Sequence, residues 1–157
     1  TQALFLSDTG QKFQMWMAEV LPKEVVKEMI ARGGDLDHDE LKERIGHIID
    51  DPVKFGYIMK FFKTMYPYSA RKDGTENDVE QGAVLDRLDV GKIVCPSLIM
   101  HGTKDANVNI GDSEFAAEKI QRSELYRIEG GSHFAFWVSD HATEAQEAAI
   151  RFFREYL

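Results

Sequence analysis

Asp105 and His133 each follow a strand-like segment of this sequence, and together they could transfer a proton. Asp105 ends the stretch VCPSLIMHGTKD, which begins at Val94, and His133 ends the turn GGSH, which begins at Gly130. An imidazole can take a proton from a nucleophile and later return it, while a neighbouring carboxylate fixes the tautomer of the ring and stabilises its protonated form. The two residue types therefore suit acid–base chemistry, provided that the fold brings them together.

The segments around these residues predict a fold that does so. Ser97–Met100 and Glu124–Glu129 are predicted strands, and Ile110–Ile120 has the apolar spacing of a helix that would join them. Strands joined by such a crossover helix run parallel, so their carboxyl ends lie at one sheet edge. Open α/β sheets hold their ligands at this edge. We therefore expect Asp105 and His133 to lie within hydrogen-bond distance.

The first half of the chain is predicted to be helical after one short strand. Ala3–Leu6 is an apolar run of the kind found in buried strands. The apolar spacing over residues 12–66 predicts four helices. A turn is predicted at Lys72-Asp73-Gly74, followed by a short helix within residues 78–88. The pattern is that of a helical block inserted between two strands of one sheet.

The motifs around the two strand ends resemble the C-terminal part of an α/β-hydrolase. They are HGTKD at His101–Asp105, with Val108 after it, and GGSH at Gly130–His133. The resemblance is specific over residues 93–157 and holds in outline over residues 1–89. It implies an α/β fold, namely the C-terminal part of an α/β-hydrolase parallel sheet with an inserted helical cap. The implied units are a core strand in residues 1–10, the cap in 11–77 and the C-terminal part of the core in 78–157.

The resemblance also implies roles for the acid and the base. In this family the aspartate of the HGxxD loop is the acid of the catalytic triad, and the histidine after the last strand is the base. These positions are Asp105 and His133. Some relatives place the acid after the strand that corresponds to Ala3–Leu6, where Asp8 lies, although we favour a helix cap at Asp8 or Thr9. His101 is expected to support the backbone rather than to catalyse.

The nucleophile is missing from the sequence. The chain contains no Gly-x-Ser-x-Gly, the elbow that holds the nucleophile in such folds. We therefore expect the nucleophile and the oxyanion hole to lie outside this chain, and the chain alone to be inactive. The expected partner is the missing N-terminal half, as the same polypeptide or as a second chain. The start at Thr1, just before a predicted strand, likewise predicts a cut or processed polypeptide.

The implied function is a hydrolase that acts on a small, largely apolar ester-like molecule by nucleophile–His–Asp catalysis. Methionine and aromatic side chains suit an apolar pocket, and the expected substrate-binding residues are Trp16, Met17, Phe62 and Phe134. Two alternatives stay open. One is an epoxide hydrolase or dehalogenase with an Asp nucleophile, and the other is a non-catalytic hydrolase-fold protein that binds a ligand. The residue at the upstream elbow would separate them.

The composition argues against several other classes of protein. The formal net charge of -8 disfavours nucleic acid and anionic membranes as partners, and no apolar run has the length needed to span a bilayer. The single cysteine, Cys95, cannot form an internal disulfide and is expected in the core. No cofactor or metal is expected. Asp35, Asp37 and Asp39 alternate as in a calcium loop but lack its glycine and glutamate. We expect a cytoplasmic protein.

Overall fold

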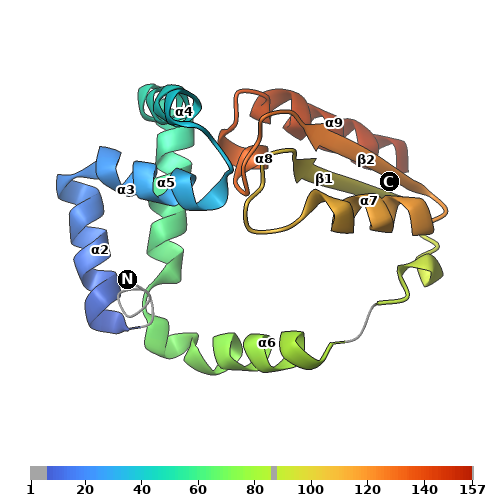
Figure 1. The fold of residues 1–157 in the computed structure, drawn as a ribbon, viewed down its shortest axis with the longest axis horizontal. Coiled ribbons are helices and arrows are strands. Elements are labelled where there is room, and N and C mark those ends of the chain that lie inside the picture. Colours follow the sequence, from blue (N-terminus) through green and yellow to red (C-terminus); the bar gives the residue numbers. More distant parts are fainter. Residues whose placement is uncertain (1–6, 86–87, 157) are drawn as a thin grey trace.

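The structure, a computed structural model, describes residues 7–85 and 88–156 of the chain. The strand predicted at Ala3–Leu6 lies outside these residues. The described elements form a group of helices at one end and a two-stranded sheet flanked by helices at the other, with α6 running between them along one side (Figure 1). No helix in this described part is both long enough and apolar enough to cross a membrane.

Four helices, here called the helical block, follow one another near the start of the chain. They are α2 (Asp8–Val20), α3 (Pro22–Gly33), α4 (His38–Asp50) and α5 (Pro52–Met65). Each start has a local cause. Ser7 caps α2 by accepting from the Gly10 N–H, Asp37 forms a capping box with Glu40 at α4, and prolines occupy the first turns of α3 and α5. The four predicted helices are confirmed, whereas the cap of α2 is Ser7 and not Asp8 or Thr9.

The core of the helical block extends into the second half of the chain. Its buried apolar residues come from α3, α4 and α5, and a sixth comes from the short helix α8 (Ala135–Val138). They are Val26, Met29, Ile30, Ile48, Ile58 and Val138. Since α8 begins two residues after His133, packing of Val138 into the helical block helps to fix the position of this histidine.

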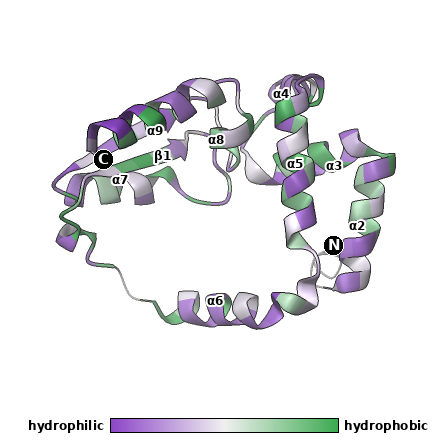
Figure 2. Ribbon diagram, turned by 180° about the vertical axis from the view of Figure 1, so that it is seen from behind, coloured by the Kyte–Doolittle hydropathy of each residue, from purple (hydrophilic) through white to green (hydrophobic). Residues whose placement is uncertain are grey.

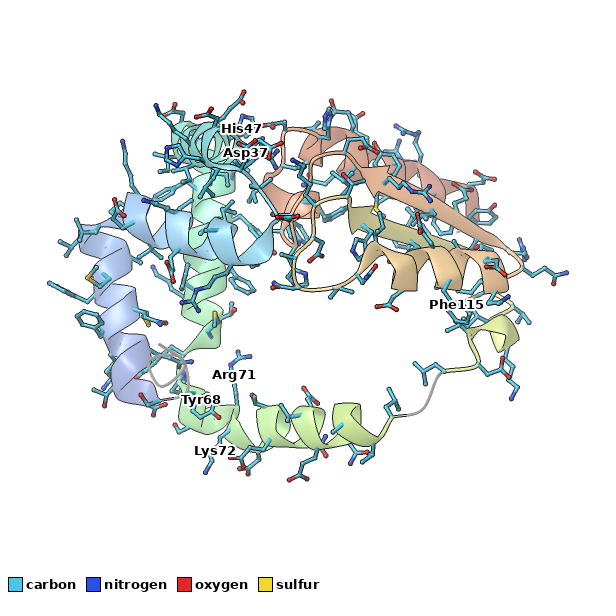
Figure 3. The ribbon with its side chains drawn as sticks, in the orientation of Figure 1. Asp37, His47, Tyr68, Arg71, Lys72 and Phe115 are labelled. Carbon is cyan, nitrogen blue, oxygen red and sulfur yellow. The ribbon has the colours of Figure 1, made fainter. Side chains whose placement is uncertain are left out.

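The segment from the helical block to the sheet is more helical than predicted. It contains η1 (Tyr68–Ala70), α6 (Lys72–Val84) and η2 (Val90–Lys92), and Figure 3 labels Tyr68, Arg71 and Lys72 where α6 begins. The turn predicted at Lys72-Asp73-Gly74 is therefore wrong, because one glycine costs a helix only about 1 kcal/mol relative to alanine. The boundary expected between residues 77 and 78 falls inside α6.

The second half of the chain forms the predicted parallel βαβ unit. Strand β1 (Ser97–Gly102) leads through α7 (Ile110–Lys119) to β2 (Ser123–Ile128), and α9 (Ala142–Tyr156) ends the described chain. The strands pair in parallel, from Ser97 opposite Ser123 to Gly102 opposite Ile128. Helices α7 and α9 lie on opposite sides of the sheet (Figure 1), and β1 is mainly hydrophobic (Figure 2). This unit places residues 103 and 129 at the same sheet edge.

Asn109 caps α7, because its side chain accepts from the Gly111 N–H at 2.7 Å. One detail of this half differs from expectation. Cys95 was expected in the core but is exposed, since β1 begins only at Ser97 and the residues before Pro96 run over the surface.

Candidate active site

The loop after β1 holds the Asp105 side chain in one position. One carboxylate oxygen, Oδ1, accepts from the backbone N–H groups of Asn107 at 2.8 Å and Val108 at 3.0 Å. The side chain is only 7% exposed. This is the Asx-type turn that an aspartate forms readily with backbone two or three residues ahead. The second oxygen, Oδ2, remains available to another partner.

The loop after β2 places His133 beside Asp105. Gly130 has a φ of 62°, which favours glycine, and a side chain at Gly131 would lie 2.5 Å from the Cβ of Ala135. The two loops are also joined to each other. The Gly130 N–H donates to Thr103 Oγ1 at 2.9 Å, and the Lys104 N–H donates to the Gly131 carbonyl at 2.8 Å. The turn GGSH is thus built against the loop that carries the aspartate.

Asp105 and His133 form a hydrogen-bonded pair. His133 Nδ1 lies 2.9 Å from Asp105 Oδ2. An ionised carboxylate can only accept, so Nδ1 carries the proton of this bond. The imidazole is 41% exposed, and its Nε2 has no hydrogen-bond partner among the described residues. The proximity expected from the strand ends is therefore found.

The environment of Asp105 favours its ionised form. Burial by itself would raise the pKa of this carboxyl group. The Val108 N–H, the His133 side chain and the Asn107 N–H outweigh burial, and together they hold the pKa of Asp105 below its ordinary value. A carboxylate that stays ionised can stabilise a positive charge on His133.

Neither of the other two candidate side chains contacts His133. Both ring nitrogens of His101 are engaged elsewhere: Nδ1 lies 2.7 Å from Ser113 Oγ, and Nε2 lies 3.1 Å from the Val108 carbonyl. Asp8 instead binds Ser69, whose backbone N–H and hydroxyl donate to its two oxygens at 2.8 and 2.7 Å. The backbone N–H of Ser69 is the main reason that the pKa of Asp8 is lowered. The partner of His133 is therefore Asp105.

An apolar cavity of about 430 Å³ lies next to this pair. Of the four expected binding residues, Met17, Phe62 and Phe134 line it, whereas Trp16 does not. Trp16 is 53% exposed and lies on the outer side of α2, beside Phe13. Four further apolar lining residues were not among those expected to bind substrate, because helix packing decides which apolar side chains face the cavity. These are Val25, Met29, Phe61 and Met65.

The cavity reaches the loops of the candidate pair. Asn107 and Phe134 line it, and these residues follow Asp105 and His133 closely in sequence. Gly33, at the end of α3, lines it as well. A few polar side chains complete the lining, among them Glu28 and Arg32, which form an ion pair with each other on α3. The cavity thus runs between the helical block and the edge of the sheet.

Tyr57 of α5 makes an aromatic contact with α8. Its ring stacks on Trp137 of α8, with centroids 4.6 Å apart and planes inclined by 15°. Burial raises the pKa of the Tyr57 hydroxyl. Tyr57, Tyr66 and Tyr68 are not among the residues that line the cavity.

Comparison with known proteins gives one informative result. No family model matches the sequence, and a search of curated proteins finds no match. Among solved structures, the chain is similar to an alpha/beta hydrolase fold protein from Nakamurella multipartita, with 30% identity and a TM-score of 0.91. The match covers 98% of this chain and 54% of that protein, so the chain spans about half of its length. Together with the parallel sheet, this similarity shows that the chain has the fold of part of an α/β-hydrolase.

Proposed function

We propose that this chain supplies the acid and the base of a hydrolase that cleaves a small, largely apolar ester-like substrate. The observation that carries the proposal is the hydrogen-bonded pair Asp105–His133 beside an apolar cavity. The nucleophile and the oxyanion hole lie outside this sequence, which has no Gly-x-Ser-x-Gly elbow. The chain alone is then inactive and needs the upstream part of the fold, in the same polypeptide or in a second chain.

In this mechanism His133 is the proton carrier. Its Nδ1–H is held by Asp105 Oδ2, so the ring keeps the tautomer in which Nε2 has a free lone pair. Nε2 takes the proton of the nucleophile as the nucleophile attacks the substrate carbonyl. The same nitrogen then gives the proton to the leaving alcohol, and a second cycle with water frees the acid product. Asp105 stays ionised throughout and stabilises the imidazolium.

The cavity supports a small apolar acyl or alkyl group as the part of the substrate that is bound. A volume of about 430 Å³ lies within the range of small-molecule sites, which are mostly apolar with a few polar groups. Met17, Phe62 and Phe134 supply flexible and aromatic surface. Because most lining residues belong to α2, α3 and α5, we propose that the helical block is the cap over the active site.

The test is hydrolysis of p-nitrophenyl esters of increasing acyl length by the full-length protein. We expect turnover with a preference for apolar acyl groups that fit the cavity. His133→Ala should abolish turnover, and Asp105→Asn should lower kcat on the order of 10⁴-fold. His38→Ala is the matched control, because His38 is exposed at the start of α4. Near-normal turnover by His133→Ala would contradict the proposal.

The same protein distinguishes the alternatives. Labelling by a fluorophosphonate indicates a serine nucleophile. Turnover of epoxides or haloalkanes without such labelling indicates the branch with an Asp nucleophile. Binding of apolar esters without turnover of any of these substrates would leave a ligand-binding protein and overturn the catalytic proposal.

A further inference from the structure

Helix α4 carries three charged or ionisable side chains that reach out of the helical block. Glu40, Arg44 and His47 follow one another at spacings of four and three residues, so they share one face of the helix. Their partners are Lys104, in the loop after β1, and Asp140, between α8 and α9. We call these three residues the α4 stripe. Figure 3 labels His47 on this helix.

The first contact of the α4 stripe, here called its first arm, joins Glu40 to Lys104 in the loop of Asp105. Glu40 accepts from Lys104 Nζ, and Lys104 is the residue directly before Asp105. Glu40 is itself fixed, because its other carboxylate oxygen accepts from the Asp37 N–H at 3.0 Å in the capping box. The main cause of the lowered pKa of Glu40 is its hydrogen bond to Lys104. One end of α4 is thereby tied to the acid loop.

The second arm reaches the segment that follows His133. Arg44 lies 3.1 Å from one oxygen of Asp140. His47 Nε2 lies 3.0 Å from the other oxygen and also contacts Lys54 Nζ. The Arg44 side chain is only 11% exposed. A pair with one nearly buried partner is held more firmly than an exposed pair, for which solvent screens most of the attraction. Asp140 follows α8, so this arm holds the far side of the His133 loop.

A backbone contact between the two arms joins both loops to the helical block. The carbonyl of Gly33, at the end of α3, accepts from the His133 N–H at 2.7 Å and from the Ala106 N–H at 3.3 Å. Next to it, the Asp35 N–H donates to the Lys104 carbonyl at 2.9 Å. Gly34 must lack a side chain here, because a Cβ would lie 2.8 Å from the Cβ of Ser132.

We propose that the α4 stripe and the Gly33 carbonyl form a clamp that sets the distance between the loops of Asp105 and His133. Glu40 and Arg44 are then positioning residues for the acid–base pair, although neither touches His133 or the cavity. This inference rests on the proposed function only for its catalytic consequence. In structural terms, the helical block both covers the cavity and holds Asp105 and His133 together.

The clamp predicts an effect on kcat rather than on KM. None of the cavity-lining residues in the described part of the chain belongs to α4. Loosening the clamp should therefore lower kcat, through poorer alignment of His133, and leave KM nearly unchanged. A change in the covering of the cavity alone would change KM instead.

The experiment compares Glu40→Gln and Lys104→Gln with Glu43→Gln in the full-length protein. Glu43→Gln is the matched control, since Glu43 lies on the same helix and forms none of the ion pairs found over residues 7–85 and 88–156. Hydrogen exchange of residues 103–108 and 130–138 is measured together with kcat and KM for the ester substrates. We expect Glu40→Gln and Lys104→Gln to speed exchange and to lower kcat by about two- to fivefold, the range of a partly exposed pair.

The readouts separate the clamp from the proposed function. Exchange that is no faster in Glu40→Gln than in Glu43→Gln overturns the clamp, even if the protein is an active hydrolase. Faster exchange in a protein that hydrolyses no ester supports the clamp and overturns the proposed function. Asp140→Asn tests the second arm in the same way, with faster exchange expected over residues 130–138.

Discussion

His101 Nε2 lies 3.6 Å from Asp105 Oδ2, the same oxygen that binds His133 at 2.9 Å. The shorter contacts of His101 are those with Ser113 Oγ and the Val108 carbonyl. Since Val108 also donates its N–H to Asp105, His101 supports the turn that presents the aspartate. One histidine thus holds the loop in place, and the other is available for chemistry.

The supporting role of His101 predicts a loss of stability when its ring is removed. His101→Ala should lower the free energy of unfolding by about 2–3 kcal/mol, because the partners of a buried, hydrogen-bonded ring are left unsatisfied. Urea-induced unfolding measures this change. His38→Ala, at an exposed position, should change stability by less than about 0.5 kcal/mol. Equal effects of the two substitutions would show that His101 does not support the loop.

Two glycines should respond to alanine in opposite directions. At Gly131 a Cβ would meet the Cβ of Ala135 at 2.5 Å and the carbonyl oxygen of Ile128 at 2.9 Å, so Gly131→Ala should cost about 1–3 kcal/mol. Gly46 lies inside α4, and beyond the backbone of its own helix no atom lies within 4 Å of the place that a Cβ would take. Gly46→Ala should therefore stabilise by about 0.5–1 kcal/mol. Thermal unfolding of both variants checks the pair. A stabilising Gly131→Ala would refute the tight packing of Gly131 against Ala135 and Ile128.

Local signals in the sequence predicted much of this fold. Prolines and capping residues mark the starts of α3, α4 and α5, and the two loop motifs follow apolar strands, so the proximity of Asp105 and His133 could be expected. Their catalytic roles stay predictions. The turn predicted from composition at Gly74 is wrong, because Gly74 and its polar neighbours lie in helix α6.

The parts that could not be predicted depend on contacts between distant segments. Met17 and Trp16 are adjacent and both apolar, and only the packing of α2 decides which of them faces the cavity. Glu40 and Lys104 are 64 residues apart, so no spacing rule relates them. The strand predicted at Ala3–Leu6 lies outside the described residues, and its place in the sheet stays a prediction.

The adjacent residues Met17 and Trp16 provide a matched test of the cavity. Met17→Trp would fill part of the space that Met17 lines, so KM should rise by about tenfold or more for octanoyl esters and change little for acetyl esters. Trp16→Ala removes a larger side chain from an exposed position and should leave both values within about twofold. Kinetics with the two esters measure this difference. An equal effect of Met17→Trp on both esters would exclude this cavity as the acyl site.

The lowered pKa of Asp105 makes a prediction about stability as a function of pH. Burial opposes ionisation, but the Val108 N–H, the His133 side chain and the Asn107 N–H together favour it, so the pKa is lower in the folded chain than in the unfolded chain. An acid of this kind contributes stability above its unfolded pKa, which is about 4 for aspartate, and the contribution is lost as pH falls through the folded value.

Asp105→Asn should therefore destabilise the protein by a constant amount at neutral pH, and the difference from the unmodified protein should shrink as the pH falls below about 4. Asparagine can still accept from the N–H groups of Asn107 and Val108, so the turn is retained while the charge and the acceptor for His133 Nδ1–H are lost. Urea-induced unfolding over this pH range provides the measurement. Against a His133→Ala background the pH-dependent part should be smaller, because one of the groups that lower the pKa has gone. A difference that stays constant down to about pH 3 would mean that Asp105 is not held ionised by these contacts.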